Sequence, residues 1–433
     1  MNETVRVGIV GLGTVGTGVV RLLADSTDHI SRHAGRQIRV AQAVCRDIHK
    51  NRNLPLSADQ VSSDIQSISL DPSISVAVLL VGGLEPARSM TIELLEHGKD
   101  IVTANKALLA EHGPELFDLA RRKGRSIAFE ASIAGGIPIV AAISECLAAN
   151  RIQSIRGILN GTSNFILSTM EEDAADYSET LTRAQAEGYA EADPSMDVDG
   201  TDATQKLAIL AHLAFGQWVP WHDIQRTGIE NVDLDLIRFA HELGYRIRLI
   251  AVAQKGVDGL AMRVAPTLVR LGTPLAETHG AFNAVSVLGD AVGPMFFHGL
   301  GAGQMPTASA VVADIIDTVV GRTAITFQTT GLLDASRSTH SLNKTDLQGR
   351  FFLRFHVTDK PGILAHITGI LGEYGISIAS VIQHEAPNAD TTGVPLVIMT
   401  HICSTQSIQN AMAAIDVAGV TQGMNTCLSV LDE

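Results

Sequence analysis

The sequence has few cysteines, few aromatic residues and no long apolar run. Its four cysteines among 433 residues are scattered and form no C-x-x-C pair, which argues against a disulfide framework and a structural zinc site. No stretch approaches the roughly 18–20 apolar residues of a membrane-spanning helix. The net charge is −14 without a dense lysine and arginine cluster, so neither nucleic acid nor a membrane is an expected partner. A strand pattern from Val5 leaves no room for a secretory signal, so we expect a cytoplasmic protein.

The patterns that are present indicate three parts. A chain of 433 residues, 45% apolar and 18% charged, exceeds one hydrophobic core and has the composition of a globular protein. Over residues 1–138, β-branched runs alternate with helical patterns, which predicts an α/β domain with a doubly wound parallel sheet. Glycines and a proline at 135–138 indicate a hinge into a mixed α+β domain over 139–304. Residues from about 305 to 333 are expected to complete the first domain, before a polar linker at 334–349 and a small module at 350–433.

Three local patterns give specific structural expectations. Residues 14–33 form one amphipathic helical stretch, and a further helix is expected near residues 114–123. The C-terminal module, with strand, turn and helix patterns, is expected to be of a ββαβ type.

A glycine-rich loop follows the first predicted strand. Gly11, Gly13 and Gly16 have G-x-G-x-x-G spacing between that strand and a helical pattern. The first glycine permits a tight turn, the second lets the backbone approach a pyrophosphate, and the third lets the helix pack on the strand. The spacing therefore predicts dinucleotide binding at the helix N-terminus.

The end of the second strand bears on the choice between NADP and NAD. An NAD site commonly places an acid there to bind the ribose 2′-hydroxyl. Here Cys45 and Arg46 precede Asp47, and Lys50 follows closely. Arg46 and Lys50 can hold a 2′-phosphate, or they are solvated loop charges. We expect NADP, with NAD possible.

An acidic segment leads to a single lysine. Residues 186–206 read "AEGYAEADPSMDVDGTDATQK" and crowd carboxylates before Lys206. A helix is expected to begin near Thr201, which puts Asp202 one turn before the lysine on the same face. Asp202 can keep the lysine in place and charged, or relay a proton. An ordinary surface ion pair in a solvated acidic loop is the alternative.

Several motifs together resemble homoserine dehydrogenase. These are the glycine loop, "TANKALLA" at 103–110, "NGTSN" at 160–164 and the acidic segment. The acidic segment matches in order at Ala184, Gly188, Tyr189, Asp193, Pro194, Asp197, Gly200, Asp202 and Lys206. The resemblance covers about residues 1–330 and is to the monofunctional form, while "DKPGILAHITGILGEYGISI" in the tail resembles an ACT domain. It implies a Rossmann domain, an α+β catalytic and dimerisation domain, and a ferredoxin-like ACT domain.

The resembled family interconverts L-homoserine and L-aspartate 4-semialdehyde by hydride transfer with NAD(P), as part of threonine, methionine and isoleucine biosynthesis. Hydride delivered to an aldehyde leaves an alkoxide, which needs a nearby proton donor. The resemblance implies Lys206, Lys106 and Asp202 as the catalytic residues. The sequence does not rank the two lysines.

The resemblance also implies binding residues. Glu191 and Asp197 can bind the substrate's ammonium group, with Gly188, Tyr189 and Thr162 completing the substrate site. Helix capping by Thr162 or Ser163 is the plainer explanation for that segment. The expected cofactor residues are Gly11, Leu12, Gly13, Thr14, Val15, Gly16, Arg46, Lys50, Gly82, Thr103, Lys106 and Gly303.

A monovalent cation, with sodium as the expected ion, is a further implication. Glu130, Ile133, Gly135 and Ile137 match positions that hold the ion largely through main-chain carbonyls, a donor type that suits a hard cation. A plain glycine and proline hinge is the alternative.

The tail suggests an amino-acid effector, with L-threonine as the expected ligand. Asp359 can bind its ammonium group, and the turn at Gly362 exposes helix N–H groups to its carboxylate. The module could instead only join subunits. A homodimer or a homotetramer is expected in either case.

Two rival functions stay open at this point. A dehydrogenase of 2-hydroxy acids would need a catalytic histidine, arginine and aspartate set, and no persuasive one is present. A catalytically silent amino-acid sensor built on Rossmann and ACT domains would have no need of Lys106, Asp202 and Lys206.

Overall fold

The N-terminal domain is built on a six-stranded parallel sheet in the order β3-β2-β1-β4-β5-β6. Its strands are β1 (Val5–Val10), β2 (Ile38–Val44), β3 (Val61–Ser62), β4 (Ile74–Leu79), β5 (Asp100–Thr103) and β6 (Ile127–Ala128). The computed structural model describes residues 4–256, 259–329, 333, 348–384 and 393–432. The strand order reverses between β1 and β4, which opens a ligand crevice at the carboxyl ends of the strands. The predicted Rossmann-type domain is confirmed.

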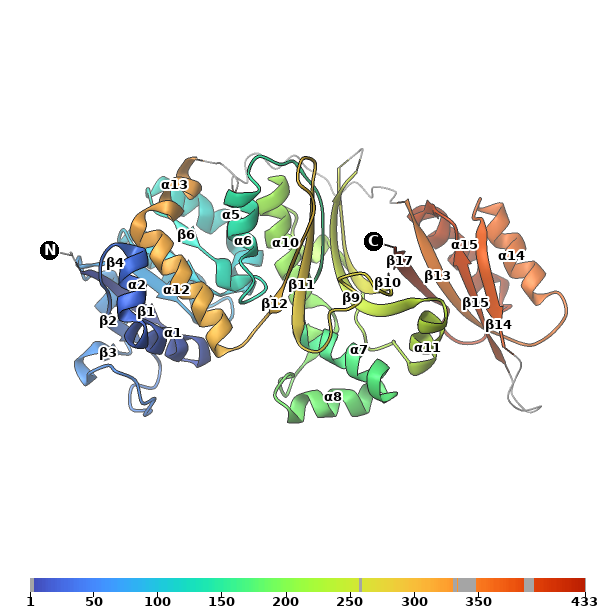
Figure 1. The fold of residues 1–433 in the computed structure, drawn as a ribbon, viewed down its shortest axis with the longest axis horizontal. Coiled ribbons are helices and arrows are strands. Elements are labelled where there is room, and N and C mark those ends of the chain that lie inside the picture. The colour runs from blue at the N-terminus through green and yellow to red at the C-terminus, as the bar shows by residue number, and fades with distance from the viewer. Residues whose placement is uncertain (1–3, 257–258, 330–332, 334–347, 385–392, 433) are drawn as a thin grey trace.

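Helices from two distant parts of the chain accompany this sheet (Figure 1). They are α1 (Thr14–Asp25), α2 (Thr27–Ala34), α3 (Gln66–Ser69), α4 (Ala87–Glu96), α5 (Lys106–Arg122), α12 (Gln304–Val320) and α13 (Arg322–Thr329). Helix α12 returns from far along the chain to lie against α1, where the Gln304 side-chain amide donates to the Thr14 carbonyl and the Thr17 hydroxyl, at 3.0 Å each.

Two helix predictions were wrong in their limits. The stretch 14–33 is two helices separated at Ser26, not one. The helix expected near 114–123 begins at Lys106 and contains Pro114. Its start is set by Asn105, whose side chain accepts a hydrogen bond from the Leu108 N–H. That cap outweighs the break that a proline normally signals.

The second sheet runs through the other two parts of the molecule in the order β12-β11-β7-β9-β10-β17-β13-β15-β14. Its strands are β7 (Ile152–Ile158), β9 (Tyr245–Lys255), β10 (Leu260–Arg270), β11 (Phe282–Gly289), β12 (Gly293–Leu300), β13 (Gln348–Val357), β14 (Ile378–Gln383), β15 (Val394–Thr400) and β17 (Thr426–Leu431), with the short β8 (Gln225–Arg226) and β16 (Cys403–Ser404) beside it. The middle helices are α6 (Ile139–Ala141), α7 (Gly161–Asp173), α8 (Tyr177–Ala186), α9 (Ser195–Val198), α10 (Thr201–Phe215) and α11 (Leu234–Glu242).

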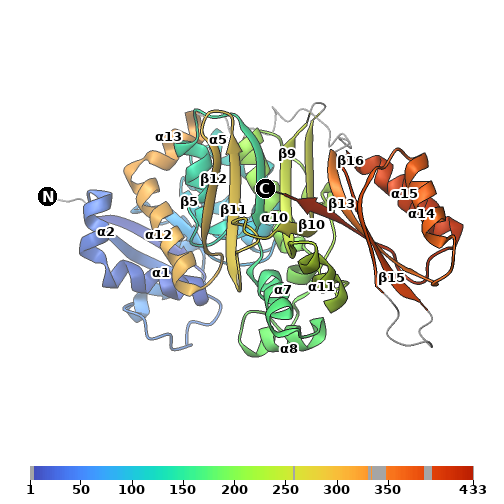
Figure 2. The same ribbon diagram turned by 45° about the vertical axis from the view of Figure 1, so that its right-hand side comes forward.

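The C-terminal module has the order β13-α14-β14-β15-α15-β17, with α14 (Ile363–Glu373) and α15 (Thr405–Ala418). The ββαβ prediction missed the last strand, whereas the ferredoxin-like expectation is confirmed. Strand β17 pairs with β13 and also runs parallel to β10 of the catalytic domain, where Leu268 is opposite Val430. In Figure 2 it is the dark red strand at the C-terminus, between β10 and β13. The predicted linker at 334–349 lies mostly outside the described residues, and its last two residues belong to β13.

Helix α10 occupies the centre of the catalytic domain, and its residues 201–213 are buried. Polar side chains on such a helix must be paired within the protein. Within the described residues, no helix has the length and apolar character to cross a bilayer.

Candidate active site

Three charged side chains meet at the centre of the molecule. The Asp202 carboxylate contacts the Lys106 ammonium through Oδ1 at 2.8 Å and the Lys206 ammonium through Oδ2 at 2.7 Å. The Asp202 and Lys206 side chains are only 5% and 10% exposed, while that of Lys106 is 37% exposed. The Asp202–Lys206 pair is therefore buried and is not a surface ion pair. Solvent reaches the cluster from the side where Lys106 lies.

The two lysines come from different domains. Lys106 begins α5 directly after β5, at the carboxyl edge of the parallel sheet. Asn105 fixes this turn, since its amide also donates to the carbonyls of Val81 (2.9 Å) and Gly83 (2.7 Å). Lys206 and Asp202 are one turn apart on α10, as predicted. The sequence reasoning overlooked Asn105, although an asparagine directly before a helix is a capping signal.

Uncharged groups hold the buried end of this cluster. The Lys206 ammonium donates to the Leu159 carbonyl at 2.7 Å. The Asn160 amide donates to Asp202 at 2.8 Å and to Asp197 at 2.7 Å, while its Oδ1 accepts from the Ser163 N–H and so caps α7. The helix cap is thus Asn160 rather than the threonine or serine beside it.

The electrostatics differ between the two lysines. Asp202 raises the pKa of Lys106 and outweighs the opposing effect of burial. Burial lowers the pKa of Lys206 despite the same carboxylate. For Asp202, burial acts to raise the pKa, but Lys206 and Lys106 together hold that pKa below its usual range. The cluster therefore combines a permanent anion, a strongly held cation and a lysine that gives up its proton more readily.

The acidic segment divides into acids that shape the backbone and acids that face the cluster. Asp193 and Asp199 accept hydrogen bonds from the N–H groups of Ser195 and Thr201, two residues further on. Asp197 is bound to Asn160, and burial followed by the nearby Asp202 raises its pKa. Glu191 is exposed, and its charge contributes to the raised pKa of Lys106.

The expected substrate loop lies next to this cluster. Gly188 has a φ of +80°, a conformation that favours glycine, and Tyr189 follows with its ring stacked on Phe165 at 4.4 Å. The Thr162 hydroxyl donates to the Tyr189 carbonyl at 2.7 Å. Thr162 thus ties the start of α7 to the loop that carries Gly188 and Tyr189.

The glycine loop has the form that a dinucleotide requires. Gly11 has a φ of +105°, and a Cβ on Gly16 would lie 2.0 Å from the Gly11 carbonyl oxygen. A Cβ on Gly13 would meet nothing within 4 Å, so this face is open, and Gly13 caps α1 without a side chain. Leu12 lies within this turn, and Thr14 and Val15 begin α1. An open face at the start of a helix, where N–H groups lack partners within the helix, fits a pyrophosphate.

The loop after β2 carries the predicted basic residues. Arg46 and Lys50 are exposed. One carboxylate oxygen of Asp47 accepts from the N–H groups of His49 and Lys50, at 3.0 Å each, and so serves its own turn. Arg52, which the sequence reasoning missed, donates to the Leu12 carbonyl at 3.0 Å and joins this loop to the glycine loop.

Three other expected cofactor positions lie at the same edge of the sheet. The Thr103 hydroxyl is buried between the Leu79 carbonyl (3.0 Å) and the Asn105 N–H (3.1 Å), so its role is to hold the loop. Gly82 lies in the loop after β4, and a Cβ there would meet nothing within 4 Å. Gly303 caps α12 with a φ of +127°.

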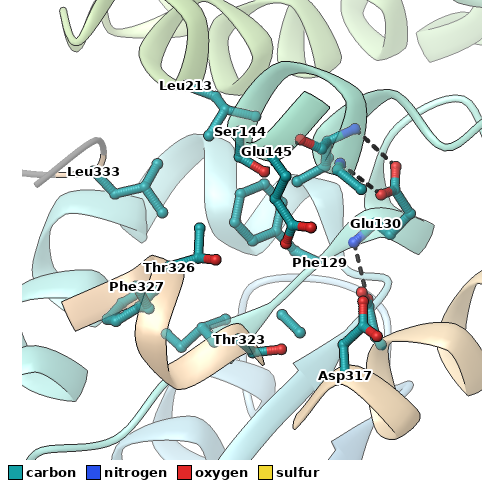
Figure 3. Close-up of a pocket in the computed structure, with 15 residues that line it drawn as sticks. Phe129, Glu130, Ser144, Glu145, Leu213, Asp317, Thr323, Thr326, Phe327 and Leu333 are labelled. Carbon is teal, nitrogen blue, oxygen red and sulfur yellow. Dashed lines mark hydrogen bonds between the residues drawn. The ribbon is translucent and has the colours of Figure 1, made fainter. Parts of the chain in front are cut away.

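The four residues expected to hold a cation lie in the segment between β6 and α6, where Figure 3 shows Glu130. The Glu130 carboxylate accepts from the N–H groups of Val140 and Ala141 at 2.8 Å each, and burial raises its pKa to about 7. The Glu130 and Ile137 carbonyls accept from the N–H groups of Ile133 and Ile139. Gly135 has a φ of +54°, and its Cβ would lie 2.4 Å from the Gly301 carbonyl oxygen, which excludes other residues there.

A cavity of about 80 Å³ lies beside this hinge and away from the charged cluster. Phe129, Leu213 and Phe327 are among its apolar walls, and Glu145 and Asp317 are among its acids (Figure 3). Neither lysine of the cluster lines it.

In the C-terminal module, Gly362 caps α14 with a φ of +92°. Asp359, three residues earlier, is exposed and accepts a hydrogen bond from the Gln383 amide at 3.3 Å. The two predicted effector residues therefore lie in one exposed turn.

Comparison with protein-family models gives three matches along the chain. Residues 11–130 match the NAD-binding domain of homoserine dehydrogenase, residues 138–316 match homoserine dehydrogenase, and residues 351–419 match the ACT domain.

Individual relatives agree over the full length. Homoserine dehydrogenase of Pseudomonas aeruginosa is 43% identical over 96% of both chains, and that of Bacillus subtilis is 36% identical over 99% of this chain and 98% of the relative. Among solved structures, a homoserine dehydrogenase from Thiobacillus denitrificans has a TM-score of 0.92 at 39% identity and 99% coverage of both chains. A hyperthermophilic archaeal homoserine dehydrogenase mutant in complex with NADPH has a TM-score of 0.62 at 25% identity, over 73% of this chain and 97% of its own. With the charged cluster and the glycine loop in place, these matches show that the chain belongs to the homoserine dehydrogenase family, oxidoreductases that act on a CH–OH group.

Proposed function

We propose that the chain interconverts L-homoserine and L-aspartate 4-semialdehyde and that Lys206 moves the proton. The observation that carries this proposal is the Asp202 carboxylate shared by two lysines at 2.7 and 2.8 Å. A bound nicotinamide nucleotide supplies or accepts the hydride. In aldehyde reduction, the Lys206 ammonium donates a proton to the developing alkoxide; in homoserine oxidation, the neutral amine accepts it.

The pKa directions support this division of work. A proton-transfer group is most effective when its pKa lies near the working pH. Burial moves the pKa of Lys206 in that direction, whereas Asp202 keeps Lys106 charged. Two of the three ammonium donors of Lys206 go to Asp202 and Leu159, which leaves one for the substrate oxygen. Lys106 then acts as a fixed cation that stabilises negative charge on that oxygen.

The acids nearest the cluster suit an amino-acid substrate. Glu191 is exposed and Asp197 is half-buried, and both contribute negative potential at Lys106. We assign them to the substrate's ammonium group. Gly188 and Tyr189 lie in the loop that Thr162 of α7 holds, and we assign these three residues to the same substrate site.

For the cofactor, the proposal is NADP, with NAD as a second substrate. One oxygen of the Asp47 carboxylate serves its own backbone, which weakens Asp47 as a partner for a ribose 2′-hydroxyl. Arg46 and Lys50 are exposed beside it and suit a 2′-phosphate. The glycine loop would hold the pyrophosphate at the start of α1, and Gly82, Thr103 and Gly303 shape the rest of the crevice.

A monovalent cation is proposed at the hinge, held by main-chain carbonyls of Glu130, Ile133, Gly135 and Ile137. The donor chemistry fits, because each carbonyl that already accepts one N–H has a second lone pair.

The proposal has three further parts. L-Threonine regulates the enzyme through Asp359 and Gly362. The chain assembles as a homodimer or a homotetramer, and it is located in the cytoplasm.

The test is to mix the purified full chain with L-homoserine and oxidised NADP and to follow absorbance of the reduced nicotinamide. We expect turnover with L-homoserine and none with a 2-hydroxy acid that lacks the amino group. If the folded full chain shows no turnover with L-homoserine and either NADP or NAD, the result would instead support a catalytically silent amino-acid sensor.

A further inference from the structure

One buried asparagine touches the support of the catalytic lysine without being part of the charged cluster. Asn283, on β11, is fully buried, and its amide donates to the Leu159 carbonyl at 3.1 Å. The same carbonyl accepts from the Lys206 ammonium at 2.7 Å. A single main-chain oxygen therefore joins Asn283 and Lys206.

The peptide that contains this oxygen controls both sides of the cluster. Its carbonyl belongs to Leu159 and directs Lys206. The next residue is Asn160, whose side chain holds Asp202 and Asp197. A rotation of this peptide would displace the lysine and both carboxylates together. The Asn283 amide resists such a rotation because it holds the same carbonyl oxygen at 3.1 Å.

Stability does not explain why an asparagine occupies this buried position. Its Oδ1 is buried and makes no hydrogen bond within the described residues. A buried polar atom without a partner is unfavourable, and an apolar residue of the same shape would avoid that cost. Exchange of the amide's oxygen and nitrogen gives no relief, because Oδ1 would then face the Leu159 carbonyl oxygen.

Asn283 also lies against a chain segment that crosses between the two domains, at Gly301. A Cβ on Gly301 would lie 2.0 Å from Asn283 Cγ, so the Gly301 backbone lies directly on the amide. Gly301 in turn touches the first hinge, where the Gly136 N–H donates to the Leu300 carbonyl at 3.0 Å. The segment at Gly301 thus lies against the residue that holds Leu159, and the segment at Gly135 and Gly136 is linked to Asn283 through it.

We infer that Asn283 is a positioning residue, which orients the Leu159 carbonyl and thereby Lys206, and which transmits the position of the two domain crossings to the site. The inference rests on the proposed proton transfer by Lys206.

The test is Asn283→Leu in the full chain. The leucine keeps shape and burial and removes the unpaired oxygen, so the melting temperature should be equal to or above that of the wild type. Turnover should nevertheless fall on the order of 10²-fold, the effect of misplacing a reacting group by about 1 Å. The KM for NADP should stay unchanged. Because the Lys206 ammonium loses a fixed acceptor, its pKa should fall, and aldehyde reduction should lose activity at lower pH than in the wild type.

Asn164→Leu is the matched control. Asn164 is equally buried and has an unpaired Oδ1, but its amide donates to the Thr278 and Gly280 carbonyls instead. Unlike the Leu159 carbonyl, which keeps the Lys206 donor, these two carbonyls lose the asparagine donor that they share, so Asn164→Leu should lower the melting temperature and leave the pH profile in place. Gly301→Ala is a second route to the effect, because its methyl group displaces the Asn283 amide.

Wild-type turnover and pH profile in Asn283→Leu would overturn the inference, as would a loss of activity with an unmoved pH profile. If Asn283→Leu fails to fold, Gly301→Ala decides by the same pH profile. Should Lys206→Ala itself stay active, the proposed function fails; should Lys206→Ala be inactive while Asn283→Leu is normal, only the present inference fails.

Discussion

A carboxylate between two ammonium groups determines what this site can do. Exposed ion pairs contribute little to stability, about 0–1 kcal/mol, and buried ones are often no better than apolar packing. Asp202 and Lys206 are almost fully buried, and leaving one of them unpaired would cost about 3–5 kcal/mol. The arrangement is therefore explained by chemistry: it keeps one lysine charged and brings a second towards a usable pKa.

The first prediction concerns Asp202→Asn. Removing the anion lowers the pKa of both lysines, since the Asp202 charge raises the pKa of Lys106 and opposes the lowering that burial causes at Lys206. Aldehyde reduction needs an ammonium, so its rate at high pH should begin to fall at a lower pH than in the wild type. Homoserine oxidation needs the neutral amine and should reach its plateau at a lower pH. Profiles of kcat/KM against pH in both directions measure this, and an unshifted profile would show that Asp202 does not set the lysine charge.

The second prediction concerns cofactor choice. Arg46→Ala should reduce kcat/KM for NADP more than for NAD, because only NADP carries the 2′-phosphate that a guanidinium can bind. Arg39→Ala is the matched control, an exposed arginine at the other end of the same strand. Equal losses with both cofactors would remove Arg46 from this role.

Single residues were predictable where the signal is local. The pairing of Asp202 with Lys206 follows from helix spacing. The sequence did not show whether this pair is buried or exposed. The contact of Lys106 with Asp202 could not be predicted from spacing, because Lys106 lies in another domain and only the fold brings it to the cluster. Arg52 and Asn283 act through main-chain carbonyls that are distant in sequence, and such contacts leave no periodic pattern.

Among the elements, α10 and the start of α7 form the rigid part of the site. Helix α10 is buried over residues 201–213, so its charged face can only point into the cluster. The start of α7 adds Asn160, which caps the helix and holds both Asp197 and Asp202.

The third prediction tests this double role. Asn160→Ala should destabilise the protein by about 1 kcal/mol through the lost cap. Turnover should fall far more, on the order of 10²-fold, because both carboxylates lose their common donor. The control is Asp176→Ala, which removes a similar side-chain cap from α8, where Asp176 accepts from the Glu179 N–H at 2.9 Å. If the two variants lose activity to the same small extent, Asn160 is only a cap.

The elements also show where sequence patterns fail. Pro114 suggested a helix start, but the Asn105 cap begins α5 eight residues earlier. The last strand, β17, was missed because its partners β10 and β13 lie far away in the chain, and a short strand is recognised mainly by its pairing.

Across the whole molecule, the catalytic domain and the ACT domain share one sheet. Strand β17 bridges β10 and β13, and Arg354 of the ACT domain holds Asp233 at the start of α11 through two hydrogen bonds of 2.7 and 2.8 Å. The domains are thus mechanically joined. A truncation before the ACT domain would also expose the edge of β10, so regulation is better tested by point variants in the full chain.

The fourth prediction is that millimolar L-threonine inhibits the full chain. The effector must bind one state better than another, and a tenfold preference corresponds to about 1.4 kcal/mol of coupling. Asp359→Ala should abolish the inhibition without changing basal turnover, while Glu373→Gln, an exposed acid at the end of α14, should leave it intact. Equal inhibition of wild type and Asp359→Ala would place threonine elsewhere, most simply in the active site as a homoserine mimic.

The central claim is that Lys206 moves the proton, and its most direct test is the turnover of Lys206→Ala with L-homoserine and NADP beside that of Lys106→Ala. Removing a positioned acid or base lowers the rate by roughly 10²–10⁴-fold. We expect a loss of this size for Lys206→Ala, with cofactor affinity near that of the wild type. A Lys206→Ala enzyme that kept more than half of its kcat would contradict the account and transfer the role to Lys106.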